Sequence, residues 1–436
     1  MRYLVQPTRI LVVGGGAREH ALAWKLGTEP GVNEVVVAPG SDAIGREPRV
    51  RVAPGVNPLD PAAILALARE RAVELVVIGP EAPLAAGVAD SLTEAGIPVF
   101  GPSAAAARIE TSKAFCREVA EAAGVPMARG RVFEVEERRA AIEYATELAV
   151  SGGIVVKEDG LAAGKGVTVC DTADEAAPVI AAMDARFVVE ERLVGPEASV
   201  IALADGRIAF GLPIARDHKR LGDVDTGPNT GGMGAISPIP DLSDTAADDL
   251  VVRFHLPILA ELARRGSPFR GALYAGLMLT DDGPRLLEFN ARFGDPETQA
   301  ILPRLAGPLG PLLLAAARGA LPHGPAALQA SLPGATVAIV LASGGYPATP
   351  TIGDRIEGVE EAAADGALVF HAATRATDDR GWTTAGGRVL TVVGLGLDAG
   401  TARLVAECAA NRISWPGMQR RHDIGVSPAA PVGAGR

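Results

Sequence analysis

The chain has 436 residues, of which 48% are hydrophobic and 21% charged, and its formal net charge is −11. This composition excludes a disordered or fibrous protein, and the length suits two to four domains of roughly 100–200 residues each. No apolar run reaches the ~18 residues of a membrane span, the first residues lack the design of a signal peptide, and the negative charge argues against nucleic-acid binding. Three separated cysteines, Cys116, Cys170 and Cys408, form neither a disulfide pattern nor a zinc motif. We therefore expect a cytoplasmic α/β protein.

Short β-branched runs alternate with helical patterns over the first hundred residues. Strands are expected at 9–14 and 74–79. The pair Asp60 and Pro61 is typical of a helix start, because Asp caps the helix and Pro suits its first turn. Continuous apolar strands that alternate with helices are typical of a parallel sheet covered on both faces. The sequence therefore predicts a doubly wound α/β domain over residues 1–103.

The pattern changes after residue 103. Two helical stretches at 104–123 end at a Gly-Val-Pro sequence, and a small unit of strands and helices then runs to residue 192. Mixed strands and helices continue to about residue 330, and a compact α/β unit with two strong strand signals follows. The end of the sequence is rich in Pro, Gly and Ala, a composition that favours disorder. We expect the parts to be 104–125 with 193–330, 126–192, 331–425, and a disordered tail at 426–436.

A glycine-rich turn, Gly14 to Gly16, separates the first expected strand from the first expected helix. Its backbone N–H groups and the helix N-terminus favour an anion, so one interpretation is a phosphate site. The other is a tight turn without a ligand. The dinucleotide-binding pattern GxGxxG fails at its third glycine, which is Glu19, and this argues against an NAD-dependent enzyme.

A second glycine-rich segment, 157–166, lies between two expected strands. It differs from a Walker A loop because Gly166 stands where Ser or Thr would hold magnesium, and because a strand follows. Glycines let backbone N–H groups approach phosphate oxygens, and lysine ammonium groups supply positive charge. An ordinary glycine hairpin would explain the glycines but not the lysines. Only five of the 41 basic residues are lysines, and four of these lie in the segments with candidate motifs: Lys113, Lys157, Lys165 and Lys219.

The segment from Leu287 to Glu297 carries a third candidate site. Residues two apart on a strand share a face, so Glu288 and Asn290 are expected side by side. A carboxylate and an amide oxygen suit Mg²⁺ bound to the phosphates of ATP. Arg292 continues that face and could bind a transferring phosphoryl group. The alternative is a polar strand end with a local ion pair.

Two further segments carry weaker signals. Charged residues at 216–220 precede the glycine-rich stretch 227–234, which is unlike a core segment, although a solvated loop is the alternative. The expected strand at 188–191 leads through a short connection to Glu197. Such a connection can present backbone groups to an adenine edge and a carboxylate to ribose hydroxyls, but a glutamate at a strand end is common.

Together these segments resemble the ATP-grasp ligases, and among them the phosphoribosylamine–glycine ligase family. The combination of DTGPNTGGMGA at 225–235 with FNARFGDPETQ at 289–299 is highly specific for that family. The segments occur in the order that the family has, and the resemblance covers roughly residues 9–425. The other matching segments are, in chain order, GGGAREHALAWK, GPEAPL, SKAF, KEDGLAAGKGV, DHKR, GALYAGLM and ASGGYP.

The resemblance implies an ATP-grasp fold, with 126–192 as a small lid over ATP and 104–125 with 193–330 as the main body. The doubly wound domain before it would help to bind the ribosyl phosphate, and the small α/β domain at 331–425 would pack against the others. By position in the family motifs, the resemblance implies Lys165 and Arg292 as catalytic groups; Lys113, Lys157, Lys165, Glu190, Glu191, Leu193 and Glu197 as ATP contacts; Gly15, Gly16, Asp217, Lys219, Arg292 and Asp295 as substrate contacts; and Glu288 and Asn290 as metal ligands.

The reaction that the resemblance implies joins glycine to 5-phosphoribosylamine at the expense of ATP, a step of purine biosynthesis. Its products are glycinamide ribonucleotide, ADP and phosphate, and glycyl phosphate is the expected intermediate. ATP and Mg²⁺, or Mn²⁺ in its place, are the expected cofactors. The expected partners are the two small-molecule substrates, without nucleic acid or membrane, and a monomer is expected. The alternatives are another ATP-grasp carboxylate–amine ligase and, more remotely, a nucleotide-binding regulator or an NAD-dependent oxidoreductase.

Overall fold

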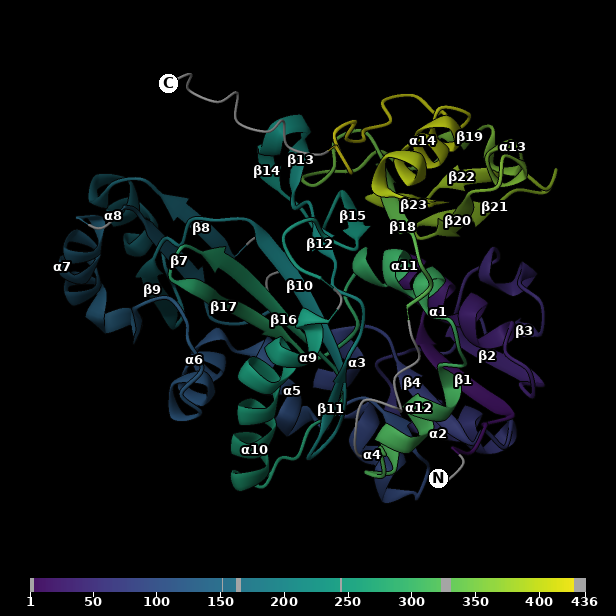
Figure 1. The fold of residues 1–436 in the computed structure, drawn as a ribbon, viewed down its shortest axis with the longest axis horizontal. Coiled ribbons are helices and arrows are strands. Elements are labelled where there is room, and N and C mark those ends of the chain that lie inside the picture. Colours follow the sequence, from purple (N-terminus) through teal and green to yellow (C-terminus); the bar gives the residue numbers. More distant parts are fainter. Residues whose placement is uncertain (1–3, 151, 162–165, 244, 323–330, 427–436) are drawn as a thin grey trace.

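The computed structural model (Figure 1) describes residues 4–150, 152–161, 166–243, 245–322 and 331–426. Lys165, one of the two predicted catalytic residues, lies outside these ranges, as does nearly all of the tail that the composition predicted to be disordered.

The N-terminal sheet contains five parallel strands in the order β3-β2-β1-β4-β5, which confirms the predicted doubly wound class. Alternate residues of the central strand β1 (Arg9–Gly14) are buried in two different hydrophobic clusters, one on each face of the sheet. The Asp60 carboxylate accepts the backbone N–H groups of Ala62 and Ala63, so the predicted helix start is also confirmed. The other elements are β2 (Glu34–Pro39), β3 (Val50–Val52), β4 (Leu75–Ile78), β5 (Val99–Phe100), α1 (Ala17–Gly27), α2 (Pro61–Glu70), α3 (Glu81–Ala85) and α4 (Val88–Glu94).

The lid is a four-stranded antiparallel sheet with a hydrophobic core of its own. Its strand order is β6-β9-β7-β8, and two helices pack against it. The core is separate from the rest of the molecule, and in it the rings of Phe133 and Phe187 stack with centroids 5.9 Å apart. Figure 1 shows the lid at the left end of the molecule. Its elements are β6 (Gly130–Phe133), α7 (Arg138–Ala149), β7 (Ile154–Glu158), β8 (Val167–Cys170), α8 (Ala173–Ala181) and β9 (Phe187–Glu191).

The main body is built on a second antiparallel sheet, in the order β11-β10-β16-β17. In the register of β16 with β17, Tyr274 pairs with Asn290 and Gly276 pairs with Glu288, so two predicted site residues lie on the last strand of this sheet. The elements are α5 (Ala104–Thr111), α6 (Lys113–Ala122), β10 (Glu197–Asp205), β11 (Ala209–Gly211), α9 (Ala246–Leu250), a π-helical turn (Val251–His255), α10 (Leu256–Arg264), β16 (Arg270–Thr280), β17 (Gly283–Asn290), α11 (Glu297–Ile301) and α12 (Gly310–Ala317).

The third large sheet joins the middle of the chain to the C-terminal domain. Its order is β12-β15-β18-β23-β20, and its first two strands come from the segment before residue 330. The segment that connects β12 to β15 forms a small hairpin of its own, β13 (Arg220–Gly222) with β14 (Thr226–Asn229). The elements of this region are β12 (Arg216–Asp217), β15 (Gly234–Ser237), β18 (Ala335–Ala342), β19 (Arg355–Ile356), α13 (Val359–Ala364), β20 (Leu368–His371), β21 (Thr374–Ala376), β22 (Trp382–Thr384), β23 (Arg388–Gly396) and α14 (Ala399–Ala410).

None of the helices in the described part of the chain is long and apolar enough to cross a membrane. Short 3-10 turns lie at Ile44–Arg46, Val135–Glu137, Asp223–Asp225 and Leu302–Arg304.

Candidate active site

The glycine-rich turn after β1 is filled by the side chain of Glu19. The Glu19 carboxylate accepts the Gly16 N–H at 2.7 Å and the Arg18 Nε–H at 2.6 Å, and it is almost fully buried. A Cβ atom at Gly79 would lie 2.0 Å from Glu19 Oε1, so the glycines around the turn make room for this carboxylate. Gly15 is needed for another close approach, because a Cβ there would lie 2.8 Å from the carbonyl oxygen of Gly40. The Gly16 amide is therefore used inside the protein, and the substrate role of Gly15 and Gly16 stays a prediction.

Arg292 is held between two carboxylates from different helices. Its guanidinium lies 3.3 Å from Glu81 of α3 and 3.1 Å from Glu110 of α5. Burial alone would raise the pKa of Glu81, but Arg292 and Arg18 hold it below its usual range. Burial raises the pKa of Glu110 in spite of Arg292. The structure thus gives Arg292 fixed partners, and its side chain as a whole remains 19% exposed.

Glu288 and Asn290 lie together on one face of β17, as the strand periodicity predicted. Asn290 Nδ2 donates to Glu288 Oε1 at 3.4 Å, which leaves the amide oxygen of Asn290 free of that contact. The Glu288 side chain is 42% exposed, so its carboxylate is accessible from solvent. A carboxylate and an amide oxygen on one strand face are the ligand types that a hard divalent cation prefers.

Lys219, which follows β12, contacts two carboxylates of the main-body sheet, Glu197 of β10 and Glu288 of β17. Its Nζ lies 3.2 Å from Glu197 Oε2 and 3.6 Å from Glu288 Oε1. Burial opposes the ammonium, but Glu197 and Glu288 raise the pKa of Lys219 well above its usual range. The predicted ribose contact, the predicted metal ligand and the predicted substrate contact are therefore direct neighbours.

Two predicted ATP-contacting lysines lie on opposite sides of the lid boundary. Lys113, the first residue of α6, donates from Nζ to the carbonyl oxygen of Gly160 at 2.8 Å. Lys157 of β7 donates to the carbonyl oxygen of Leu287 at 3.0 Å, next to Glu288, and also pairs with Glu190. These contacts connect the lid with the main body.

The residues expected near the adenine, at the end of β9 and in the connection that follows it, make different contacts. Glu190 is buried and pairs with both Lys157 and Arg117, the latter at 3.3 Å. The Glu191 carboxylate accepts the backbone N–H of Arg129 at 2.8 Å, and its own N–H donates to the Arg129 carbonyl. Leu193 follows β9 in the connection to β10. Both carboxylates therefore also contact the main body, Glu190 through Arg117 of α6 and Glu191 through Arg285 of β17, which lies 3.6 Å away.

Asp217 and Asp295 approach the site from β12 and from the segment before α11. Asp217 Oδ1 is buried and accepts no hydrogen bond within the described ranges. Burial and the charge of Glu297 raise the pKa of Asp217 well above its usual range. Asp295 pairs at 3.1 Å with Arg388 of β23, and this cation offsets the effect of burial and holds the pKa of Asp295 low. The C-terminal domain therefore contributes a cation to the site.

A buried chain of hydroxyl groups underlies these residues. Ser199 Oγ donates to the Glu297 carboxylate at 2.9 Å, and the Tyr274 hydroxyl lies 3.0 Å from Ser199 Oγ. Burial and the charge of Glu297 raise the pKa of Tyr274 well above its usual range, so its proton stays on the oxygen. Because the Ser199 proton goes to Glu297, Tyr274 is the donor to Ser199.

Sequence reasoning missed several residues of this site. Tyr274 lies in the family motif GALYAGLM and Glu297 in FNARFGDPETQ, so the motifs are the sequence signal for these two residues. Glu110, Arg117 and Arg388 stand in no such motif. Only the fold brings them to the site, from distant parts of the chain.

The sheets and the polar cluster between them define an ATP-grasp protein. A solved biotin carboxylase domain from Hydrogenobacter thermophilus, described in complex with MgADP, has the same fold at a TM-score of 0.69 and 17% identity, over 95% of this chain and 92% of that one. Family models give the particular group. The phosphoribosylglycinamide synthetase N domain matches residues 8–110, its ATP-grasp (A) domain residues 111–298 and its C domain residues 336–427. The chain belongs to the phosphoribosylglycinamide synthetase family.

Individual relatives agree with the family models over nearly the whole chain. A phosphoribosylamine–glycine ligase from Streptomyces coelicolor is 49% identical over 97% of this chain and 99% of its own length. One from Mesorhizobium japonicum is 43% identical over 97% and 98%. A crystal structure of phosphoribosylamine–glycine ligase from Thermotoga maritima has a TM-score of 0.78 at 33% identity, over 95% of this chain and 99% of that one.

Proposed function

We propose that the chain is an ATP-dependent carbon–nitrogen ligase that joins glycine to 5-phosphoribosylamine, giving glycinamide ribonucleotide, ADP and phosphate. The family and its relatives carry this activity. The structural observation that supports it best is the arrangement around Glu288. The carboxylate lies beside the Asn290 amide, close to the Lys219 ammonium, and next in sequence to the carbonyl that Lys157 of the lid binds. A metal-nucleotide site on β17 would therefore border a substrate site at Lys219.

ATP-grasp enzymes bind ATP and a divalent metal, and the donor set present here suits both. Asn290 uses its Nδ2 toward Glu288, so its oxygen and the exposed Glu288 carboxylate are available to a hard cation. We assign the metal to Mg²⁺, with Mn²⁺ as an alternative, and Glu288 and Asn290 as its protein ligands. When bound, the metal would neutralise charge on the phosphates of ATP.

The nucleotide would lie between the lid and the main body. The ammonium groups of Lys113 and Lys157 have positions from which each can exchange a carbonyl partner for a phosphate oxygen. Lys165, which lies outside the described residues, would contribute to the same phosphates and stabilise the transferring group. The connection after β9 would receive the adenine through the backbone near Leu193, with Glu190 and Glu191 holding that connection, and Glu197 would reach the ribose.

The proposed reaction has two steps, both of them displacements. A carboxylate oxygen of glycine forms a bond to the γ-phosphorus of ATP while the bond to ADP breaks, which gives glycyl phosphate. The amine of phosphoribosylamine then bonds to the activated carbonyl carbon, phosphate leaves with the bonding electrons, and the amine loses a proton. No covalent bond to the protein is needed.

The protein's own contribution is positioning and charge. Arg292, fixed by Glu81 and Glu110, would face the phosphoryl group that is transferred. Asp217 and Lys219 would orient glycine, while Asp295, Gly15 and Gly16 would contact phosphoribosylamine. The lid would keep water away from the acyl phosphate.

ADP release with each substrate omitted in turn tests the proposal. ADP should form rapidly only when ATP, glycine and phosphoribosylamine are all present. With ATP and glycine but no phosphoribosylamine, it should form slowly or not at all. If ADP release did not depend on glycine, or depended on another carboxylate, the protein would be a different ATP-grasp ligase. Positional isotope exchange in labelled ATP tests the intermediate, since its absence at saturating glycine with or without a phosphoribosylamine analogue would contradict glycyl phosphate.

We also propose that the enzyme works as a cytoplasmic monomer. The thiols of Cys116 and Cys170 are buried and unpaired, as suits a reducing compartment. Light scattering at micromolar concentration tests the monomer, and a mass of twice 44.6 kDa would overturn it.

A further inference from the structure

The segment 418–424, here named the C-terminal arm, runs between β18 and the β13–β14 hairpin. Gln419 forms a pair of 2.8 Å backbone hydrogen bonds with Ala342 at the end of β18. Ile424 is fully buried, and a Cβ at Gly234 of β15 would lie 2.8 Å from its side chain. Both ends of the arm are therefore fixed to the sheet that contains β15 and β18.

Between these anchors, the arm holds the tip of the hairpin through polar contacts. Arg421 is only 1% exposed; its guanidinium binds Asp423 through two nitrogens, at 2.7 and 2.6 Å, and Asp225 at 2.6 Å. Asp423 in turn accepts the backbone N–H of Val224 at 2.8 Å. The Asp223 carboxylate accepts the backbone N–H of His422 at 2.7 Å. These contacts join three consecutive residues of the hairpin tip, 223–225, to three consecutive residues of the arm, 421–423.

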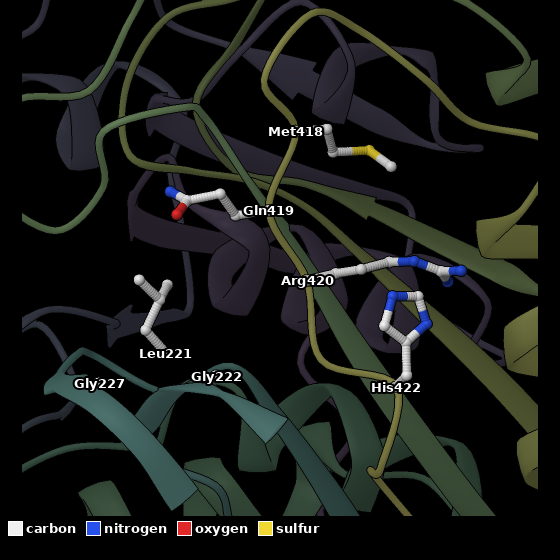
Figure 2. A pocket seen from close by; sticks show the side chains of 7 residues that line it. All are labelled: Leu221, Gly222, Gly227, Met418, Gln419, Arg420 and His422. Carbon is white, nitrogen blue, oxygen red and sulfur yellow. The ribbon is translucent and has the colours of Figure 1, made fainter. Parts of the chain in front are cut away.

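Apolar packing does not hold the hairpin in place. Residues 223–228 are exposed, and a cavity of about 530 Å³ separates the hairpin from the arm. Figure 2 shows Leu221, Gly222 and Gly227 of the hairpin on one side of this cavity, and Met418, Gln419, Arg420 and His422 of the arm on the other. Val224 and Asp225 have φ values of 54° and 52°, which residues with a Cβ seldom adopt. A conformation of this kind persists only where its surroundings determine it, and here the arm supplies those surroundings.

The hairpin leads directly to the site, because it begins one residue after Lys219. Arg421 donates to the Arg220 carbonyl oxygen at 3.3 Å. At the other end of the hairpin, Thr230 donates from both its backbone N–H and its Oγ1 to the Lys219 carbonyl oxygen, each at 2.8 Å. The backbone of Lys219 is therefore fixed by the two ends of the hairpin, and its ammonium lies between Glu197 and Glu288.

We propose that Arg421 is a positioning residue, which fixes the β13–β14 hairpin and so keeps the Lys219 ammonium between Glu197 and Glu288. It touches no reacting group and acts through the backbone on both sides of Lys219. This inference rests on the proposed ligase activity for its kinetic test.

The test is a double-mutant cycle between Arg421 and Lys219, measured by ADP release. Arg421→Lys keeps the charge but loses the two-nitrogen contact with Asp423, and should lower kcat about tenfold. In a Lys219→Ala background the same substitution should change kcat by less than about twofold, because the group that it positions is gone. Asp225→Asn, on the exposed partner of Arg421, should behave in the same way. Arg412→Lys, at a 59% exposed side chain paired with Asp365, is the control and should have no effect.

Hydrogen exchange at the Thr230 amide gives a second readout that does not depend on turnover. Arg421→Lys should speed exchange there about tenfold or more, while exchange in β9 of the lid stays unchanged. Multiplicative losses in kcat, or an unchanged Thr230 amide, would overturn the positioning role. If the unmodified enzyme released no ADP with both substrates, the proposed function would fail instead, and the exchange result would still decide the role of Arg421.

Discussion

Lys113 Nζ donates a 2.8 Å hydrogen bond to the carbonyl oxygen of Gly160, which joins the first residue of α6 to the glycine-rich loop of the lid. Asp159 adds a second link, because its carboxylate accepts the Ala114 N–H at 3.1 Å and the Ser112 hydroxyl at 3.2 Å. Burial lowers the pKa of the Lys113 ammonium, and the charge of Glu288 counteracts it in part. The glycine-rich loop thus begins on a firm contact with the main body.

We predict that Lys113→Arg and Lys157→Arg each lower kcat about tenfold or more, which corresponds to roughly 1.4 kcal/mol of transition-state stabilisation. Both ammonium groups make point contacts with a carbonyl oxygen, and a planar guanidinium is bulkier and needs two acceptors. Steady-state ADP release on purified variants with matched melting temperatures measures the effect. Arg139→Lys, whose side chain on α7 is 94% exposed, is the matched control. Wild-type rates in both lysine variants would contradict the assignment of Lys113 and Lys157 as phosphate contacts.

Glu288→Gln should raise the Mg²⁺ concentration for half-maximal activity by about tenfold or more, because the amide lacks the charge that a divalent cation needs. The fold should remain intact, since the Glu288 side chain is 42% exposed. Calorimetric titration with Mn²⁺ and ADP gives a readout apart from activity. Glu360→Gln, at a 68% exposed side chain, serves as the control. Unchanged metal dependence would contradict the assignment of Glu288.

Asp217→Asn should raise the melting temperature near pH 8 while it lowers activity. The pKa of Asp217 is raised by burial and by Glu297, so the folded protein binds more protons than the unfolded chain between about pH 4, the ordinary Asp value, and the higher folded value. Stability due to this group therefore falls as the pH rises through that window. The advantage of the variant should shrink toward pH 4.

A carboxylate with the opposite shift provides the comparison for this pH series. Hydrogen bonds from Thr377 and Arg355 lower the pKa of Asp379 to about 2. The stability that it contributes is present above about pH 4 and is lost as the pH falls toward 2. Asp379→Asn should thus lower the melting temperature at pH 7, where Asp217→Asn raises it. Equal shifts of one sign would contradict the assignment of a costly charge to Asp217.

Lys25→Arg should lower the melting temperature by roughly 1–3 °C without a change in kcat. From its place on the first helix, outside any phosphate loop, the sequence alone predicts that this substitution leaves turnover nearly unchanged. The structure adds an expected loss of stability, because Lys25 Nζ donates to the Leu305 carbonyl oxygen at 2.7 Å in a partly buried position. Burial lowers its pKa, which Glu29 opposes. Differential scanning calorimetry beside ADP release separates the two effects, and a loss of turnover at an unchanged melting temperature would contradict this role.

The strand pattern and the motifs predicted the fold class and the shared face of Glu288 and Asn290, because alternation along a strand is a local property. The partners of these residues were not predictable in the same way. Arg388 reaches Asp295 from 93 residues further along the chain, and no local pattern marks an arginine that will face a distant carboxylate.

Glu19 shows a second limit of sequence reasoning. The sequence indicated correctly that a glutamate in place of the third glycine is incompatible with the dinucleotide motif. It did not indicate that the carboxylate would take up the Gly16 amide, because that contact depends on the room left by Gly14 and Gly79. Packing around a turn can be read only from the folded chain.

β12 and β15 belong to the same sheet as β18 and β23 of the C-terminal domain. This shared sheet constrains how chimeras of related enzymes can be made. With a crossover near residue 330, β15 and β18 would come from different parents along their whole paired length. Arg388 would likewise come from one parent, and the Gly231 and Gly232 carbonyls that it binds from the other. Crossovers on either side of the lid would leave each hydrophobic core within one parent. Exchange between relatives should therefore succeed for the lid and fail for the C-terminal domain taken alone.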